Sequence, residues 1–237
     1  MSSHNISHSP AIQVQKLNYQ FMSHGESGDK QITILRDLDL EILSGEQVAI
    51  IGSSGSGKST LLSLLAGLDV PTSGSVNVNQ QVFGSLDEDG RALIRGQHMG
   101  FVFQSFQLLP SLTALENVML PLQLKSTKEA KLKATEALSK VGLHARVQHY
   151  PKQLSGGEQQ RVAIARAFAM APSILFADEP TGNLDHMTGQ MIIELLFKMN
   201  AEAGTTLILV THDIALANRC QRQLKLENGQ LHALVAA

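Results

Sequence analysis

A lysine and a hydroxyl group at the end of a glycine-rich loop are the first candidates for chemistry in this sequence. The loop "GSSGSGKST" follows the apolar run "QVAII" and opens the helical pattern "KSTLLSLLAG", which is the strand, loop and helix arrangement of a P-loop. Its glycines let backbone N–H groups converge on phosphate oxygens, and the helix N-terminus adds partial positive charge. Lys58 would reach the β- and γ-phosphates, and the Ser59 hydroxyl would bind Mg²⁺. The predicted nucleotide-binding residues of the loop are Gly52, Ser53, Ser54, Gly55, Ser56, Gly57, Lys58, Ser59 and Thr60.

Two consecutive carboxylates at the end of another apolar run could supply the rest of the site. The run "ILFADE" ends on Asp178 and Glu179. Asp178 would hold the metal through water, whereas Glu179 faces a different way and can orient or deprotonate the water that attacks the γ-phosphate. Such a pair often marks only a solvated turn, but the P-loop and the following Pro180 favour the catalytic interpretation.

A second glycine pair opens another helix in "LSGGEQQRVAIARA", residues 154–167. Two glycines are a poor start for a helix that only has to pack. The N–H groups near Gly157, together with the Ser155 hydroxyl, instead predict a second anion site. The helix body is expected to be structural, with these residues turned inward: Val162, Ile164, Ala165 and Phe168.

The composition fits a folded protein that has no membrane span of its own. The 237 residues are 43% hydrophobic, enough for one large domain or two small ones with a substantial core. No run of about 18 apolar residues occurs, and the N-terminus "MSSHNISHSP" does not resemble a secretory signal. We therefore expect a cytoplasmic chain that reaches a membrane only through a partner. A net charge of −2, without a Lys/Arg cluster, argues against nucleic acid as a partner.

The single cysteine and the N-terminal histidines are expected to carry no chemistry. Cys220 cannot form an intramolecular disulfide and has no ligand-spaced neighbours, so we interpret it as an inert thiol. His4, His8 and His24 lie in polar sequence and are interpreted as part of a solvated tail or loop, not as a metal site.

Alternating strand and helix patterns must position these groups. The runs "QVAII", "ILFA" and "TLILV" are apolar throughout, which indicates strands buried on both faces, and therefore a parallel sheet covered by helices. Strands are predicted over residues 11–21, 32–42, 46–52, 74–79, 99–104, 173–179, 205–213 and 222–231.

Helix patterns lie between these strands. Three of them end on a glycine, over residues 57–67, 126–142 and 186–204. The second is expected to begin with a capping box formed by Ser126 and Glu129. The stretch from about 105 to 165 is mostly helical and has no buried strand, so we interpret it as a helical subdomain inserted into an α/β core.

With "LSGGEQQRVAIARA" added to the two earlier motifs, the sequence closely resembles the ATP-binding subunits of ABC transporters over nearly its whole length. The resemblance implies a single ATP-binding domain, residues 1–237. It also implies an α/β fold: a P-loop NTPase core with a mostly parallel sheet, an N-terminal antiparallel β subdomain and an inserted helical signature subdomain at about 105–165. ATP and Mg²⁺ are the implied cofactors.

The LSGGE stretch stands where that family carries its signature motif. In the family, two subunits close head to tail, so that each ATP lies between the P-loop of one and the signature of the other. Three or four hydrogen bonds to a γ-phosphate, at about 1.5–3 kcal/mol each, could hold a dimer with ATP that ADP would not hold. The residues expected to act in trans are Ser155, Gly156, Gly157 and Glu158. Glu158 stands where the family most often has Gln, and we expect it to cap the turn and point away from phosphate.

Other family positions match residue by residue. Gln104 resembles the Q-loop glutamine, which senses Mg²⁺ and the γ-phosphate, and His212 resembles the switch histidine that contacts the γ-phosphate. Asp185 resembles the aspartate that runs along the dimer interface. Tyr19 matches the aromatic that stacks on adenine, although Phe21 could serve instead. The catalytic residues implied are Glu179, His212 and Gln104, and the metal ligands implied are Ser59, Gln104 and Asp178.

Finer features resemble one branch of the family. The stretches "GFVFQSFQLLPSLTALENVMLPL" and "ADEPTGNLD" are similar to lipoprotein-release, macrolide-export and cell-division ATPases, and the chain is most like the YbbA-type members. This implies an ATPase homodimer that drives an integral membrane permease, on the cytoplasmic face of the bacterial inner membrane, for export or release of a lipoprotein, lipid or hydrophobic compound. The apolar segment 106–112 is either the insert's own small core or a groove for the permease.

A soluble ABC-type ATPase that is not tied to transport stays open as the alternative. The spacing between the P-loop and Asp178 leaves no room for the coiled-coil or zinc insert of repair and chromosome ATPases. An iron–sulfur assembly type is harder to exclude by length, and "PTGNLD" argues against it. The presence of Glu179 and His212 argues against a regulatory module without turnover.

Overall fold

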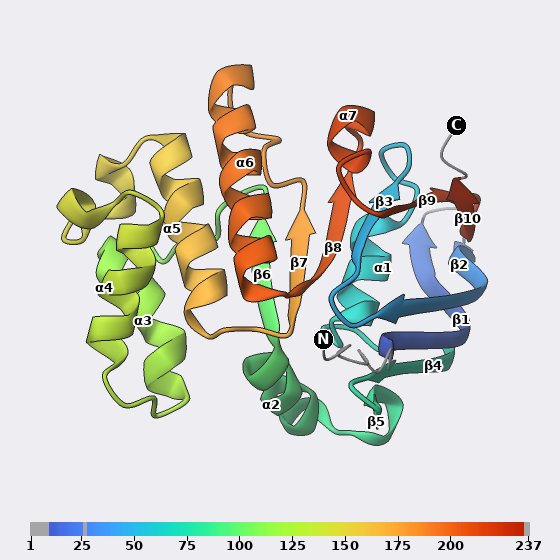
Figure 1. The fold of residues 1–237 in the computed structure, drawn as a ribbon. Coiled ribbons are helices and arrows are strands. Elements are labelled where there is room, and N and C mark those ends of the chain that lie inside the picture. Colours follow the sequence, from blue (N-terminus) through green and yellow to red (C-terminus); the bar gives the residue numbers. More distant parts are fainter. Residues whose placement is uncertain (1–9, 26–27, 235–237) are drawn as a thin grey trace, which may run out of the picture.

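The core of the molecule is a six-stranded sheet in the order β10-β9-β3-β8-β7-β6 (Figure 1). The computed structural model describes residues 10–25 and 28–234. Five strands of this sheet are mutually parallel, and β10 pairs antiparallel to β9 at one edge. Their bounds are β3 Gln47–Ile51, β6 Met99–Phe103, β7 Ile174–Asp178, β8 Thr206–Thr211, β9 Arg222–Glu227 and β10 Gln230–Leu234.

A second, antiparallel sheet lies beside the first, in the order β2-β1-β4-β5. Its strands are β1 Pro10–Gly25, β2 Gly28–Leu43, β4 Ser73–Val78 and the short β5 Gln81–Val82. One apolar cluster joins the two sheets through helix α1, Lys58–Leu65, with Ile12, Ile42, Leu61 and Val210 among its buried members. The α/β fold class with its antiparallel N-terminal sheet is thus confirmed.

Helices α3, α4 and α5 pack against one another to one side of the parallel sheet. They span Ala114–Leu124, Ala130–Lys140 and Gly156–Ala169, so α5 runs beyond the expected limit of the helical stretch at about 165. The remaining helices are α2 Glu88–His98, α6 His186–Ala203 and α7 Ile214–Ala217, with 3-10 turns at Phe83–Ser85, His144–Arg146 and Pro151–Gln153. The division of the chain into a core and an inserted subdomain stays a prediction.

The capping box predicted for Ser126 and Glu129 is wrong. Helix α4 begins at Ala130, and Glu129 precedes it with a left-handed backbone and no capping hydrogen bond from its side chain. The reason lies in the preceding helix. The N–H of Ser126 donates to Gln123 O and that of Thr127 to Leu122 O, which closes the C-terminus of α3. The residue expected to start α4 is therefore already used to end α3.

The thiol of Cys220 is buried, and burial raises its pKa to about 12. A thiol held protonated in this way is unreactive, which agrees with its interpretation as inert. His4 and His8 lie outside the described residues, whereas His24 lies in β1 and not in a loop, because its backbone pairs with Asp29 of β2. Within residues 10–25 and 28–234, no helix has the length and apolar character to cross a membrane.

The strand ends bring four loops to the same edge of the parallel sheet. Phe103 is in register with Asp178, Asp178 with Val210, and Ile51 with Thr211. Because parallel strands all end at one edge, the segments that follow β3, β6, β7 and β8 must start side by side. These are the segments that carry the P-loop, Gln104, Glu179 and His212.

Candidate nucleotide site

The P-loop wraps around its own lysine. Lys58 is the first residue of α1, it is only 9% exposed, and its Nζ donates to the carbonyl oxygens of Gly52 and Ser53 at 2.8 and 2.9 Å. Gly57 has a φ of +99°, which favours glycine, and a Cβ there would lie 2.8 Å from Ile34 Cγ2. The loop's own carbonyl groups therefore fix the position of the ammonium group.

Two of the expected metal ligands already touch. Ser59 Oγ donates to Asp178 Oδ2 at 3.1 Å, joining the start of α1 to the end of β7. Burial raises the pKa of the Asp178 carboxyl above its ordinary value, and the nearby Glu179 charge adds to this shift, whereas the Ser59 hydrogen bond and the Lys58 charge oppose it. A divalent cation at this point would relieve the cost of burying the carboxylate, so the donor set fits Mg²⁺.

Glu179 forms a pair with His212 across the strand ends. His212 Nδ1 lies 2.8 Å from Glu179 Oε1, and Thr211 Oγ1 donates to Glu179 Oε2 at 3.4 Å. The Glu179 side chain is 18% exposed and that of His212 is 72% exposed. Glu179 also has a φ of +46°, a strained backbone for a non-glycine residue. The carboxylate is thus fixed at both oxygens next to Asp178, with the imidazole reaching into solvent.

Gln104 is held by the turn that follows Glu179. Gln104 Nε2 donates to Asn183 Oδ1 at 3.2 Å, and Asn183 Nδ2 donates back to Gln104 O at 3.0 Å. Gly182 permits this approach, since a Cβ there would lie 2.7 Å from Gln104 Nε2. Asn183 was not predicted from the sequence as a site residue, although it stands inside the "PTGNLD" stretch.

These groups line one cavity of about 650 Å³. Its size suits a nucleotide. The lining residues are Ile34, Ser54, Gly55, Gly57, Lys58, Ser59, Thr60, Gln104, Asp178, Glu179 and His212. The structure therefore brings together the predicted metal and catalytic residues and six of the nine predicted P-loop residues, whereas Gly52, Ser53 and Ser56 are not among the lining residues.

Tyr19 does not line this cavity in the structure. Its hydroxyl donates to Asp69 Oδ2 at 2.5 Å, and this hydrogen bond raises the pKa of the phenol. Phe21, the alternative, is 44% exposed on the same strand. Stacking of either ring on adenine stays a prediction.

Hydrogen bonds from Arg166 of α5 fix the turn that follows Gln104. Phe106 and Gln107 have φ values of +59° and +48°, in the left-handed region that few non-glycine residues adopt. Arg166 Nη2 donates to Phe106 O at 3.0 Å and its Nη1 to Gln107 O at 2.6 Å. Burial lowers the pKa of this guanidinium. Arg166, which the sequence analysis also missed, thereby joins the signature helix to the loop that carries Gln104.

The signature residues form a capping box at the start of α5. Ser155 Oγ accepts from Glu158 N at 3.2 Å, and Glu158 Oε2 accepts from Ser155 N at 2.8 Å. The hydrogen bond from the Ser155 N–H lowers the pKa of the Glu158 carboxyl most, with smaller lowering effects from the Ser155 hydroxyl and from Arg146, which donates to Oε1 at 3.2 Å. Glu158 is therefore turned back onto its own helix start.

The two signature glycines differ in their surroundings. A Cβ at Gly157 would lie 2.5 Å from Thr188 Cγ2 on α6, so this glycine is required by contact between two helices of one chain. A Cβ at Gly156 would meet only Leu184 Cδ2 at 3.2 Å and Phe106 Cζ at 3.7 Å. Asp185, expected at a dimer interface, is exposed and caps α6 by accepting from Thr188 N at 3.0 Å.

We expect Glu158→Ala to lower the free energy of unfolding by about 1 kcal/mol, because it removes one arm of the capping box. Glu158→Gln keeps an accepting oxygen and should stay within about 0.5 kcal/mol at neutral pH. Because the folded-state pKa of Glu158 is lowered, its contribution is present above the unfolded pKa and is lost as the pH falls through the folded one. Urea unfolding at pH 7 and pH 4 measures the effect of each substitution and its pH dependence. If the Gln variant loses as much stability on acidification as the starting protein, the predicted pH dependence of the Glu158 contribution is wrong.

A parallel sheet with a P-loop at the carboxyl end of one strand, β3, and acidic groups at the end of β7, two strands away in the sheet, defines a P-loop nucleoside triphosphatase. The family within this class follows from comparison with known proteins. The family model described as "ABC transporter" matches residues 35–182. The chain belongs to the ABC transporter family, as one of its ATP-hydrolysing, ATP-binding subunits.

Relatives of known name cover nearly the whole chain. The uncharacterised ABC transporter ATP-binding protein YbbA of Escherichia coli (strain K12) is 53% identical over 94% of this chain and 98% of its own length. The lipoprotein-releasing system ATP-binding protein LolD is 51% identical in Hydrogenovibrio crunogenus, over 85% of this chain and 89% of its own. In Bordetella pertussis LolD is 47% identical, over 94% and 95%.

A solved structure shares the fold over most of the chain. The ATP-binding cassette MJ0796, in a dimeric post-hydrolysis state bound to ADP and Pi, is 42% identical and has a TM-score of 0.84, covering 95% of this chain and 100% of its own. The resemblance to ABC transporter ATP-binding subunits, and to their YbbA-type and lipoprotein-release members, is thus confirmed.

Proposed function

We propose that two copies of this chain close head to tail around two ATP molecules with Mg²⁺, and that this closure drives a membrane permease. Lys58 and the P-loop N–H groups bind the phosphates, while Ser59, Asp178 and Gln104 would hold Mg²⁺, which would neutralise phosphate charge. Glu179 accepts a proton from the attacking water, and His212 orients the carboxylate and contacts the γ-phosphate. Tyr19 stacks on adenine.

One observation carries this proposal. Among the described residues, the cavity that holds Lys58, Asp178 and Glu179 is not lined by Ser155, Gly156 or Gly157. Yet Gly156 has neither a left-handed backbone nor a close contact that demands glycine. Its bare N–H group, at the positive end of a 14-residue helix, supports an anion site that another molecule completes. The dimeric state of MJ0796 supports a second copy as that molecule.

Gly156→Asp tests this arrangement. We expect the variant to bind ATP as a single subunit within about twofold of the starting protein, and to lose turnover together with ATP-dependent dimer formation on size exclusion. The added carboxylate would repel the γ-phosphate of the second copy. Gly96→Asp, at an exposed glycine of α2 with open space around its Cβ position, is the matched control. Loss of ATP binding by Gly156→Asp alone would place the signature in its own chain's site and contradict the proposal.

The permease contact is proposed at a groove beside the Gln104 loop. A cavity of about 340 Å³ lies between β6, α3 and α5, and Phe101, Phe103, Leu109, Pro121, Leu124 and Met170 are among the residues that line it. Leu124 is 80% exposed and Leu109 is 45% exposed. Exposed apolar groups gathered around a groove favour a protein partner. Leu108, by contrast, packs on the core. Segment 106–112 therefore contributes both to the core and to the groove, the two interpretations that the sequence left open.

Leu124→Asp is expected to abolish co-sedimentation of the chain with native membranes, because a carboxylate would have to be buried in the permease contact. Its ATPase activity in the absence of membranes should not change. Leu132→Asp is the matched control, since Leu132 is 52% exposed on α4 and is not among the lining residues. Equal co-sedimentation of both variants would remove this groove as the docking site.

The cargo is proposed by similarity alone. The relatives named LolD belong to lipoprotein-releasing systems, and we propose that this chain energises export or release of a lipoprotein, lipid or hydrophobic compound. The chain would act at the cytoplasmic face of the bacterial inner membrane.

A further inference from the structure

A buried glutamine joins the signature helix to both catalytic loops of its own chain. Gln160 lies on α5 and its exposed fraction is 0%. Its Nε2 donates to Pro180 O at 2.5 Å and, more weakly, to Phe103 O at 3.4 Å. Pro180 directly follows Glu179, and Phe103 directly precedes Gln104. One carboxamide therefore holds the backbone next to both residues.

Packing alone does not explain a carboxamide at this position. Gln160 Oε1 is buried and has no hydrogen-bond partner among the described residues. A buried polar atom without a partner is unfavourable, and a methionine of similar length would fill the same space without it. What the amide contributes is therefore its pair of hydrogen bonds to the two carbonyl groups.

The backbone that Gln160 holds is strained where it carries Glu179. The φ of Glu179 is +46°, and the Glu179 carboxylate is fixed from the side of β8 by His212 and Thr211. From the opposite side, α5 fixes the next carbonyl through Gln160. A small shift of α5 against β7 therefore acts on the backbone adjoining the carboxylate.

We propose that Gln160 is a positioning residue, which transmits contact between the signature and the partner's ATP to Glu179 and Gln104 of its own chain. The proposal rests on the proposed function, because it requires the start of α5 to meet the nucleotide of a second copy. Gln160 lies within the second turn of that helix, so a displacement at Ser155 moves the carboxamide with it. Turnover at one ATP site then depends on occupancy of the other.

The test is Gln160→Met, made in the active chain and in a Glu179→Gln background. In the active chain, we expect kcat to fall about five- to tenfold, as for the loss of one or two modest hydrogen bonds, with ATP affinity of the single subunit unchanged within about twofold. In the Glu179→Gln background, ATP-dependent dimer formation on size exclusion should be unchanged, since the signature itself is intact. Gln160→Leu serves as a second apolar variant should the methionine variant not fold.

Two results would overturn the proposal. One is a kcat for Gln160→Met within twofold of the starting protein. The other is a loss of both turnover and the ATP-dependent dimer, which would indicate general disruption of α5.

Asn200→Leu is the matched control, because it removes another buried carboxamide. Asn200 lies near the C-terminus of α6, and its Nδ2 donates to Thr205 O. It should lower the melting temperature and leave kcat unchanged. A Glu179→Gln chain that forms no ATP-dependent dimer refutes the proposed function itself, whatever kcat Gln160→Met shows.

Discussion

Replacing Glu179 by Gln is expected to lower the rate of ATP hydrolysis by about 10²- to 10⁴-fold, the usual contribution of a general base. The amide keeps the size of the side chain and a hydrogen bond to His212, but it cannot accept a proton from the attacking water. The P-loop and the Ser59–Asp178 contact are unaffected. ATP therefore still binds, and because it is not hydrolysed, the proposed head-to-tail dimer should accumulate. Phosphate release and size exclusion in the presence of ATP measure the two effects.

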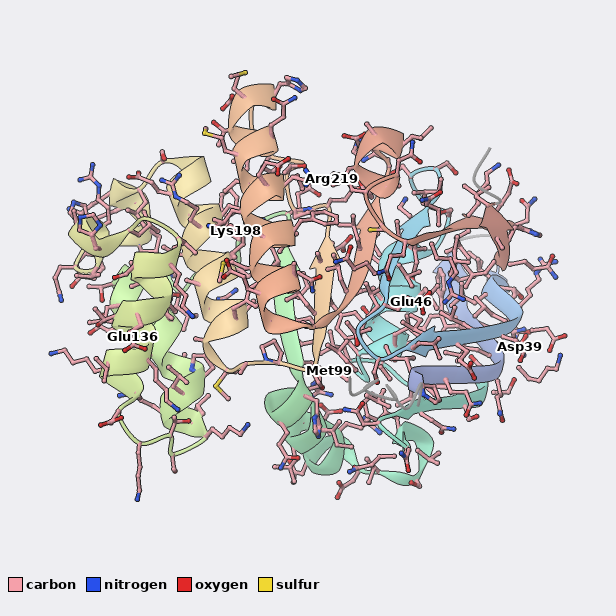
Figure 2. The ribbon with its side chains drawn as sticks, in the orientation of Figure 1. Asp39, Glu46, Met99, Glu136, Lys198 and Arg219 are labelled. Carbon is pink, nitrogen blue, oxygen red and sulfur yellow. The ribbon has the colours of Figure 1, made fainter. Side chains whose placement is uncertain are left out.

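The control for this variant is Glu136→Gln, which removes one negative charge from the outer side of α4 (Figure 2). Its turnover should be unchanged. Hydrolysis by Glu179→Gln at more than a tenth of the original rate would assign the proton acceptor elsewhere. Loss of hydrolysis without any ATP-stabilised dimer would instead contradict the trans arrangement, while leaving the role of Glu179 intact.

The parallel sheet could be predicted because its strands are apolar on both faces. All six residues of β8 and the first four of β7 are buried, so the sequence shows continuous apolar runs that no half-exposed strand would have. Helix α2 was not anticipated for the opposite reason. Its residues are mostly polar and it buries only Ile94, so no apolar run of helical length marks it in the sequence.

The chemical groups of the site could also be read from the sequence, because each follows a strand within a recognisable motif. The contacts that fix them could not, since they join residues far apart along the chain. Nothing local to Gln160 or Arg166 indicates that both reach carbonyl groups beside Gln104. Likewise, the sequence suggested that both signature glycines serve an anion site. In the structure, Gly157 is instead required by close packing against Thr188 of the same chain. Only Gly156 has no packing reason to be a glycine, so its role is the one that the proposed contact with a second copy would explain.

Replacing Lys58 by Ala is expected to weaken ATP binding by about a hundredfold or more and to abolish turnover. Hydrogen bonds to charged groups contribute about 1.5–3 kcal/mol each. The alanine variant would lack at least two of them, those that Lys58 donates to the β- and γ-phosphates. The loop itself positions the ammonium group, because Lys58 Nζ donates to the carbonyl oxygens of Gly52 and Ser53. Titration with a fluorescent ATP analogue measures the loss.

The same substitution separates the two halves of the proposed composite site. Lys58→Ala leaves the signature of its own chain untouched, whereas Gly156→Asp leaves the P-loop untouched, so only the lysine variant should lose affinity as a single subunit. Lys198→Ala, at an exposed lysine of α6, controls for the loss of one positive charge (Figure 2). Equal ATP affinities for Lys58→Ala and Lys198→Ala would show that the phosphates do not depend on this loop. The roles assigned to Asp178 and Glu179 would then also be wrong, because both carboxylates can act only on a phosphate that the P-loop binds next to them.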